Sequence, residues 1–194
     1  MNEKHETFLL FHLLYERKKR NEAKMMLETN KTLRQYVSLF IAVIAYFALH
    51  EGAHLLLALY YNVFEQVNFM GLGMQIAITR EALSETQFIV FNLGGVVMTL
   101  VVGYVLVILT KKIVTIKSKA VKAVFYYVTL AMLFTDCIYL AVLSSFFGGG
   151  DLNGIALLFP TETTAKILFV VIGIINIFIF IKFVYPKYVA AYKE

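Results

Sequence analysis

The sequence predicts an all-α polytopic membrane protein with about four transmembrane helices, a short membrane-edge β-hairpin and an amphipathic N-terminal helix. Its 194 residues are 60% hydrophobic and only 16% charged, a balance outside that of ordinary soluble domains. Four apolar runs are each long enough to cross about 30 Å of hydrocarbon. Because a single strand cannot satisfy its backbone in lipid, the runs are expected to be helices. They cover residues 36–64, 87–110, 120–147 and 164–185.

Residues 1–35 precede the first apolar run and are rich in basic side chains. An apolar stripe within them consists of Leu9, Leu10, Leu13 and Leu14. A helix with such a stripe would lie on the anionic cytoplasmic surface of the membrane. A regulatory or substrate-contacting arm is the alternative. No cleavable signal peptide is expected, because His12 interrupts the short apolar piece and a basic run follows at 17–20.

The first apolar run contains the pattern His50-Glu51-Gly52-Ala53-His54, and Glu51 is its sole carboxylate. Imidazoles and a carboxylate are costly in hydrocarbon unless something compensates them. On a helix, two histidines four positions apart share one face and suit two Zn–N bonds of about 2.0–2.1 Å. A carboxylate beside them can take a proton from metal-bound water. The pattern predicts a metal site, with hydrogen bonds to neighbouring helices as the alternative.

The segment after this run, 65–79, changes character. Polar and apolar residues nearly alternate over it, and Gly71 and Gly73 separate its two halves. This pattern is typical of a short β-hairpin, here expected at the membrane edge. If one strand edge stays open, it can pair with an extended peptide.

The second run, 87–110, carries Asn92 and the pair Gly94-Gly95. Glycines in a membrane helix allow a neighbouring helix to approach closely. Asn92 has two interpretations: its side chain forms a hydrogen bond between helices, or it faces the reacting carbonyl of a substrate. The fourth run, 164–185, is expected to pack against the others or to face lipid.

A third metal ligand is expected near the third run, 120–147. Catalytic zinc is held by three protein ligands and keeps one position for water. Asp151 follows three glycines and fits if that turn folds back into the bundle, whereas Asp136 fits if the site lies deeper. We favour Asp151, in which case Asp136 accepts a hydrogen bond from a ligand imidazole. The alternative for Asp151 is a helix N-cap.

The net charge of +5 indicates membrane topology rather than nucleic-acid binding. Of the 18 Lys and Arg residues, eight precede the first run, five lie between Lys111 and Lys122, and three follow Ile181, and only Arg80 and Lys166 lie elsewhere. This asymmetry predicts that both termini, including a tail at 186–194, are cytoplasmic. The single Cys137 excludes an internal disulfide.

Together these motifs resemble the site-2 protease group of intramembrane zinc metalloproteases, in its small bacterial branch. The HExxH pattern matches the zinc-binding helix of that group, and residues 65–79 match its membrane-edge hairpin. Residues 91–95 resemble the small-residue segment that opens the next core helix. The run Gly149-Gly150-Asp151 is similar to the motif that supplies the third zinc ligand.

The resemblance implies a zinc-dependent membrane endopeptidase, with a metalloprotease core over 36–185, in a bacterial cell membrane. Zinc would be held by His50, His54 and Asp151. Glu51 would act as the general base, and Asn92 would hold the oxyanion. The implied substrates are single-span membrane proteins or membrane peptides, cut within the bilayer. A non-catalytic metal-binding or scaffold protein of the membrane is the alternative.

Overall fold

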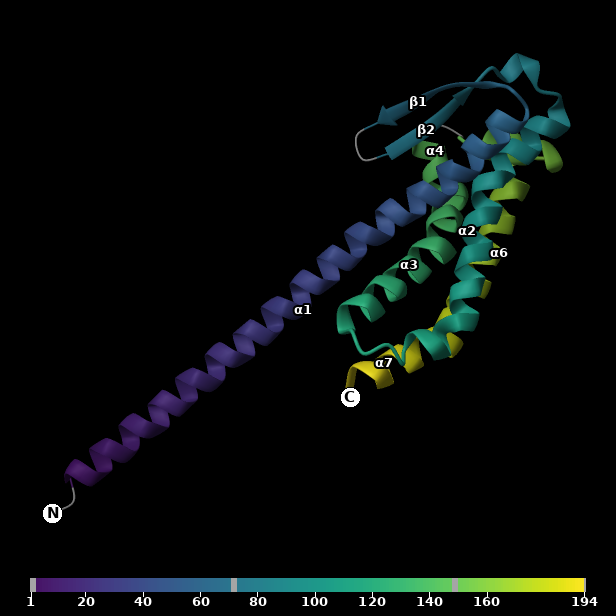
Figure 1. Ribbon diagram of the computed structural model, residues 1–194. Coiled ribbons are helices and arrows are strands. Elements are labelled where there is room, and N and C mark those ends of the chain that lie inside the picture. The colour runs from purple at the N-terminus through teal and green to yellow at the C-terminus, as the bar shows by residue number, and fades with distance from the viewer. Residues whose placement is uncertain (1–2, 71–72, 148–149, 194) are drawn as a thin grey trace. The chain divides into compact units, whose positions relative to one another are not determined.

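The structure of the protein is a computed structural model that describes residues 3–70, 73–147 and 150–193. It is mainly helical, and its described strands form a two-stranded sheet (Figure 1). The longer helices are α1 (Glu3–Tyr60), α2 (Glu85–Ile113), α3 (Lys119–Ile138), α6 (Glu162–Ile179) and α7 (Tyr185–Lys193). The strands are β1 (Phe64–Met70) and β2 (Gly73–Ile78), and short helices are α4 (Ser144–Phe147) and α5 (Leu152–Ile155).

The chain divides into two compact units, Met1–Val37 and Ser38–Glu194. In the first unit the described residues form the N-terminal part of α1, which confirms the predicted helix, and the basic side chains at 17–20 are exposed. The side chains of the predicted leucine stripe lie outside the described ones. The second unit contains the remaining helices, both strands and all of the predicted site residues.

Four helical segments among the described residues are long and apolar enough to cross a membrane, as predicted. They are Asn30–Tyr60, Glu85–Ile113, Lys119–Phe147 and Glu162–Lys193. Large apolar side chains along them stay exposed, among them Ile44, Ile108, Ile138 and Ile174. Surfaces of this kind suit contact with lipid, so the four helices suggest a membrane protein.

The first predicted span needs one correction, because the helix ends before position 64. α1 stops at Tyr60, and β1 begins at Phe64. Between them Asn62 adopts a positive φ of 55°. This left-handed conformation is one that Asn tolerates better than most residues, and a right-handed helix cannot continue through it. A local backbone reversal therefore ends a helix that apolar composition alone would have extended.

Helices α2, α3 and α6 run side by side, and α5 packs against α2 (Figure 1). α2 begins at a capping box between Ser84 and Gln87, in which each residue bonds the backbone of the other. Its last turn carries Lys111 and Lys112, which suit the negative end of the helix dipole. α2 is thus delimited at both ends by its own sequence.

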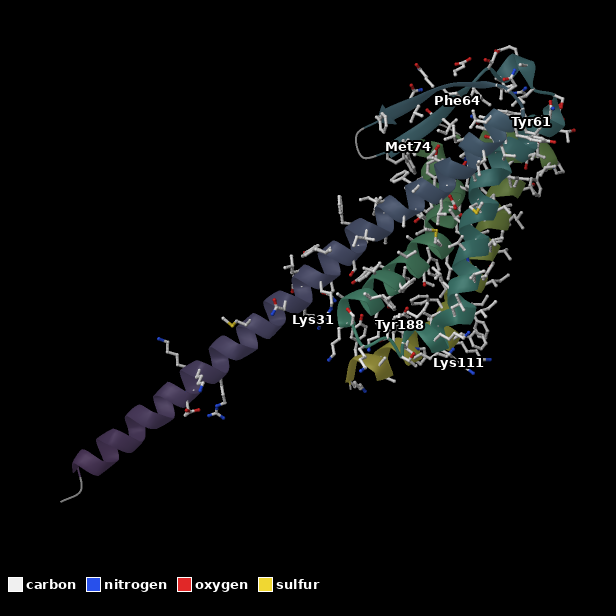
Figure 2. The ribbon with its side chains drawn as sticks, in the orientation of Figure 1. Lys31, Tyr61, Phe64, Met74, Lys111 and Tyr188 are labelled. Atoms are coloured by element: carbon white, nitrogen blue, oxygen red, sulfur yellow. The ribbon has the colours of Figure 1, made fainter. Side chains whose placement is uncertain are left out.

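The hairpin lies at one end of the second unit, and Lys111, in the last turn of α2, lies at the other. Figure 2 shows Tyr61, Phe64 and Met74 at the first end, and Lys111 and Tyr188 at the opposite end. The antiparallel pairing of β1 with β2 confirms the predicted hairpin. The hairpin packs on α1 and α2 through a buried cluster of Ala58, Val63, Ile76, Leu83 and Phe91.

The segment after the third span folds back against the bundle. Gly150 adopts a positive φ of 49°, which glycine accepts at no steric cost, and α5 follows at once. Leu152 and Ile155 of α5 are buried in a core cluster with Val96 of α2 and Phe169 of α6. The burial of these two side chains holds the preceding Asp151 against the bundle. The sequence analysis favours Asp151 as a ligand if the glycine turn folds back in this way.

Candidate metal centre

The HExxH residues lie in the last third of α1. His50, Glu51 and His54 are 6%, 9% and 3% exposed. One helical turn separates the two imidazoles, and their Nε2 atoms are 3.1 Å apart. Since positions i and i+4 share a helix face, this half of the site follows from the local sequence.

Asp151 joins the two histidines from the start of α5. Its Oδ2 is 2.9 Å from Nε2 of His50, and its Oδ1 is 3.3 Å from Nε2 of His54. All three residues offer a ligand atom within 4.8 Å of the others. The structure therefore brings together the three predicted ligands, and this group could hold a metal ion.

The separations of the three ligands suit a small tetrahedral ion. Two ligand atoms bound to zinc at about 2.0–2.1 Å and a tetrahedral angle lie about 3.3–3.4 Å apart. The contacts among His50, His54 and Asp151 are 2.9, 3.1 and 3.3 Å. These distances involve both oxygens of the Asp151 carboxylate, and one ligand atom from each residue lies within 4.8 Å of the other two.

Hydrogen bonds on the far side of each ring determine which nitrogen carries the proton. Nδ1 of His54 lies 2.9 Å from the carbonyl of Phe91, and Nδ1 of His50 lies 3.1 Å from Oδ1 of Asp136. A carbonyl and a carboxylate only accept, so both Nδ1 atoms donate. Both Nε2 atoms then face the carboxylate of Asp151, and each either donates a hydrogen to it or, once that hydrogen is lost, offers a lone pair. A cation satisfies all three electron-pair donors at once.

Asp136 lies behind His50 and not in the ligand group. It is 1% exposed and accepts hydrogen bonds from the hydroxyls of Tyr46 and Thr99. Its contact with Nδ1 of His50 is the role that the sequence gives it when Asp151 is the ligand. Sequence reasoning missed Tyr46 and Thr99. The one local signal is that Tyr46 precedes His50 by four positions and so shares its helix face.

Asp151 lies outside the four spans and is held in its ionised form. Burial raises the pKa of its carboxyl, but hydrogen bonds with His50 and His54 outweigh burial and hold the pKa at about 2. A carboxylate that stays charged near neutral pH is ready to bind a cation.

The glycine pair of α2 allows that helix to lie directly on the histidine helix. A Cβ placed on Gly95 would come within 2.6 Å of the His50 ring, and one on Gly94 would meet the side chain of Leu57. Real Cβ atoms do not approach that closely. The predicted close approach is therefore present, and Gly95 packs against a ligand side chain.

Asn92 is buried at the contact between α2 and α5. Its Nδ2 donates to the carbonyl of Phe88 at 2.7 Å, and its side chain lies where a Cβ on Gly154 would be. The amide thus bonds its own helix and packs against the segment that carries Asp151. Because this bond lies within α2, it is not the hydrogen bond between helices of the first interpretation, and the oxyanion role stays a prediction.

Glu51 lies beside the ligand group and is not part of it. Its Oε2 accepts a hydrogen bond from the backbone N–H of Ile76 in β2, at 3.2 Å. Both residues are buried. This hydrogen bond connects the HExxH carboxylate to the hairpin. No sequence pattern predicts it, because the two residues are distant in the chain.

No family model matches the chain, and neither curated proteins nor solved structures match it. The resemblance to site-2 proteases therefore stays a prediction from the motifs. The site stands on its own geometry, in which two imidazoles and a carboxylate meet inside an apolar helical bundle.

Proposed function

We propose that the protein is an intramembrane zinc metalloprotease. The observation that carries the proposal is the meeting of His50, His54 and Asp151, with Glu51 beside them and outside the ligand group. A carboxylate in that place does not bind the metal itself. It would be close to the water that a catalytic ion binds. The apolar bundle around the site points to substrates within the membrane.

Zinc fits the donor set better than the other common ions. Two imidazoles and one carboxylate are ligands that zinc takes in hydrolytic enzymes, with the fourth position left for water. Calcium and magnesium prefer six or more oxygen ligands. A structural zinc site would supply a fourth protein ligand, and the described group has three members.

The chemistry follows from the placement of the carboxylate of Glu51. His50, His54 and Asp151 would hold a zinc ion, which would lower the pKa of water towards about 7 and polarise the scissile carbonyl. Glu51 takes the proton of the attacking water and delivers it to the leaving amine. Asp136 keeps His50 in the tautomer whose Nε2 is free to bind.

The substrate has to be extended at the scissile bond, because the carbonyls of a helix are occupied by the helix itself. The edge of β2 that faces Glu51 has no strand neighbour among the described residues, and an extended peptide can add to a strand edge of this kind. Single-span membrane proteins and membrane peptides with a locally unwound stretch are the substrates proposed.

Metal analysis of purified variants tests the site. Wild-type protein is expected to hold about one zinc per chain, and His54→Ala is expected to lose it because two ligands bind zinc poorly. Glu51→Gln should keep its zinc. The matched control is Glu81→Gln, at an exposed carboxylate away from the site. Full zinc occupancy in His54→Ala would place the metal elsewhere.

Cleavage tests the function. Glu51→Gln is expected to lower cleavage of a membrane-embedded peptide by about 10²–10⁴-fold, the contribution of a general base. The same variant expressed in cells should retain bound single-span proteins that wild type releases. A Glu51→Gln protein that cleaves as well as wild type would contradict the proposal. Zinc binding without any captured membrane protein would favour a metal-binding scaffold instead.

A further inference from the structure

We propose that docking of an extended substrate on β2 releases Glu51 for catalysis. The backbone N–H of Ile76 is a single donor that Glu51 occupies in the free protein and that a substrate carbonyl takes over. Because it concerns the regulation of the same site, this inference rests on the proposed function. Its consequence is that the base becomes free only when an unwound segment is in place.

The register of the hairpin shows which edge of β2 faces away from β1. The N–H of Thr79, just after β2, donates to the carbonyl of Val63 on the β1 side. Amides alternate in direction along a strand, so those of Gln75 and Ala77 also face β1, while that of Ile76 faces away from it. The bond from Ile76 to Glu51 agrees with this alternation. The outer edge of β2 therefore faces the HExxH carboxylate.

A substrate strand on that edge competes with Glu51 for one hydrogen. Each added strand presents a carbonyl towards its neighbour at every second residue, and the amide at the centre of this edge is that of Ile76. Glu51 and Ile76 are both buried, so water is poorly placed to replace either partner. A carbonyl that bonds Ile76 therefore displaces the carboxylate, which then turns to the attacking water.

This exchange selects for unwound segments. The carbonyls of a transmembrane helix already bond amides four residues further along, so an intact helix passing the site leaves Glu51 on Ile76. Only a stretch whose carbonyls are free can take its place. The bond between Glu51 and Ile76 thus couples substrate unwinding to the availability of the base.

Isotope labelling can observe the shared donor without any substrate. Gln75-Ile76 is the one Gln-Ile pair in the sequence, so ¹³C-carbonyl Gln with ¹⁵N-Ile selects the Ile76 amide. Ala77-Ile78 is likewise the one Ala-Ile pair and supplies a control amide on the same edge. Glu51→Ala should move the Ile76 signal upfield and speed its hydrogen exchange about ten- to a hundredfold. The Ile78 signal should stay in place. An unchanged Ile76 amide would overturn the inference.

Kinetics in proteoliposomes test the exchange itself. Ile76→Pro removes the N–H on the outer edge and leaves the amides that face β1 intact, a position where strands accept proline. Ile76→Ala is the matched control, since it removes the same side chain and keeps the N–H. With the peptide that wild type cleaves, Ile76→Pro should lower KM about two- to tenfold below Ile76→Ala, because the substrate no longer has to break the bond to the charged Glu51, which is stronger than the bond that replaces it. Its kcat should not fall, because Glu51 no longer has to be displaced.

The outcomes separate the two proposals. A cleaving wild type whose Ile76→Pro variant loses kcat at unchanged KM would show that the amide holds the base during the reaction, which overturns the exchange alone. A wild type that neither binds zinc nor cleaves overturns the proposed function, and the exchange with it.

Discussion

His50 is held through both of its ring nitrogens, and each contact limits what the other can do. Nδ1 faces Asp136 at 3.1 Å and Nε2 faces Asp151 at 2.9 Å. The two acids therefore have different roles, although both are carboxylates close to the same ring. Asp151 also contacts His54, whereas Asp136 bonds the hydroxyls of Tyr46 and Thr99. A ligand contacts both histidines, and a positioning group contacts one.

The two acids are expected to differ when substituted. Asp151→Ala should abolish zinc binding because it removes a ligand. Asp136→Asn should weaken binding by about 10–100-fold, as is typical when the group that orients a ligand is changed. Competition with a chelator of known affinity measures both. The reverse order of effects would make Asp136 the ligand.

The two hydroxyls on Asp136 can be tested in the same way. Tyr46→Phe and Thr99→Val each remove one donor from a buried carboxylate, a loss of about 1–3 kcal/mol in the free energy of unfolding. The double variant should lose less than the two effects added, since both donors serve one carboxylate. Thermal unfolding of the zinc-loaded protein measures this loss, and zinc affinity is measured alongside.

Thr110→Val is the matched control. Thr110 is a buried threonine of α2 whose hydroxyl donates to the carbonyl of Leu106 in the same helix. Zinc affinity in Tyr46→Phe equal to that of wild type would exclude the positioning role.

At the scale of elements, the site is assembled where α1, α2 and α5 meet. α1 supplies the histidines, α5 follows directly on the carboxylate, and α2 contacts both through small residues. Gly95 lies under the His50 ring, and the Gly154 of α5 lies against Asn92. Both contacts require glycine, because any side chain would push the ligand-bearing segments apart. The small residues of α2 and α5 thus determine whether the three ligand atoms meet.

Substitution of the buried glycine should therefore damage the metal site without touching a ligand. Gly95→Ala places a Cβ within 2.6 Å of the His50 ring, so the ring must move and zinc binding should be lost or strongly weakened. The matched control is Gly52→Ala within the HExxH pattern, where a Cβ meets nothing within 4 Å. Gly52→Ala should keep its zinc and stabilise the helix by up to about 1 kcal/mol. Equal zinc contents in the two variants would show that the close contact does not matter.

At the scale of the whole molecule, the basic residues and the site mark opposite ends of the second unit. Lys111 lies at the end away from the hairpin residues Phe64 and Met74 (Figure 2). With the basic end in the cytoplasm, the hairpin and the loop before α5 lie towards the outer side. This orientation is a prediction from charge, and it determines from which side water and substrate reach the site.

Cysteine labelling tests the orientation. In a Cys137→Ser background, Glu81→Cys and Lys117→Cys place exposed thiols at the two ends of α2. An impermeant reagent added outside intact cells should label position 81 and spare position 117. Labelling after permeabilisation is the control for both. The opposite pattern would invert the topology and place both termini outside.

The elements that the sequence predicts correctly are those defined by local patterns. The four spans follow from apolar runs of sufficient length, and the hairpin follows from alternation around two glycines. The pair of imidazoles follows from a spacing of four on a helix. The end of α1 was predicted too late, because composition cannot show that Asn62 reverses the backbone.

The sequence by itself determined the four spans, the hairpin and the histidine pair, because each depends on residues a few positions apart. Tertiary structure decided which acid meets the pair, since 101 positions separate His50 from Asp151 and either acid was compatible with the spacing. It also decided that Tyr46 and Thr99 serve Asp136, and that Ile76 bonds Glu51. Such contacts depend on how helices and hairpin pack, and packing is set by the fit of many side chains at once rather than by any one motif.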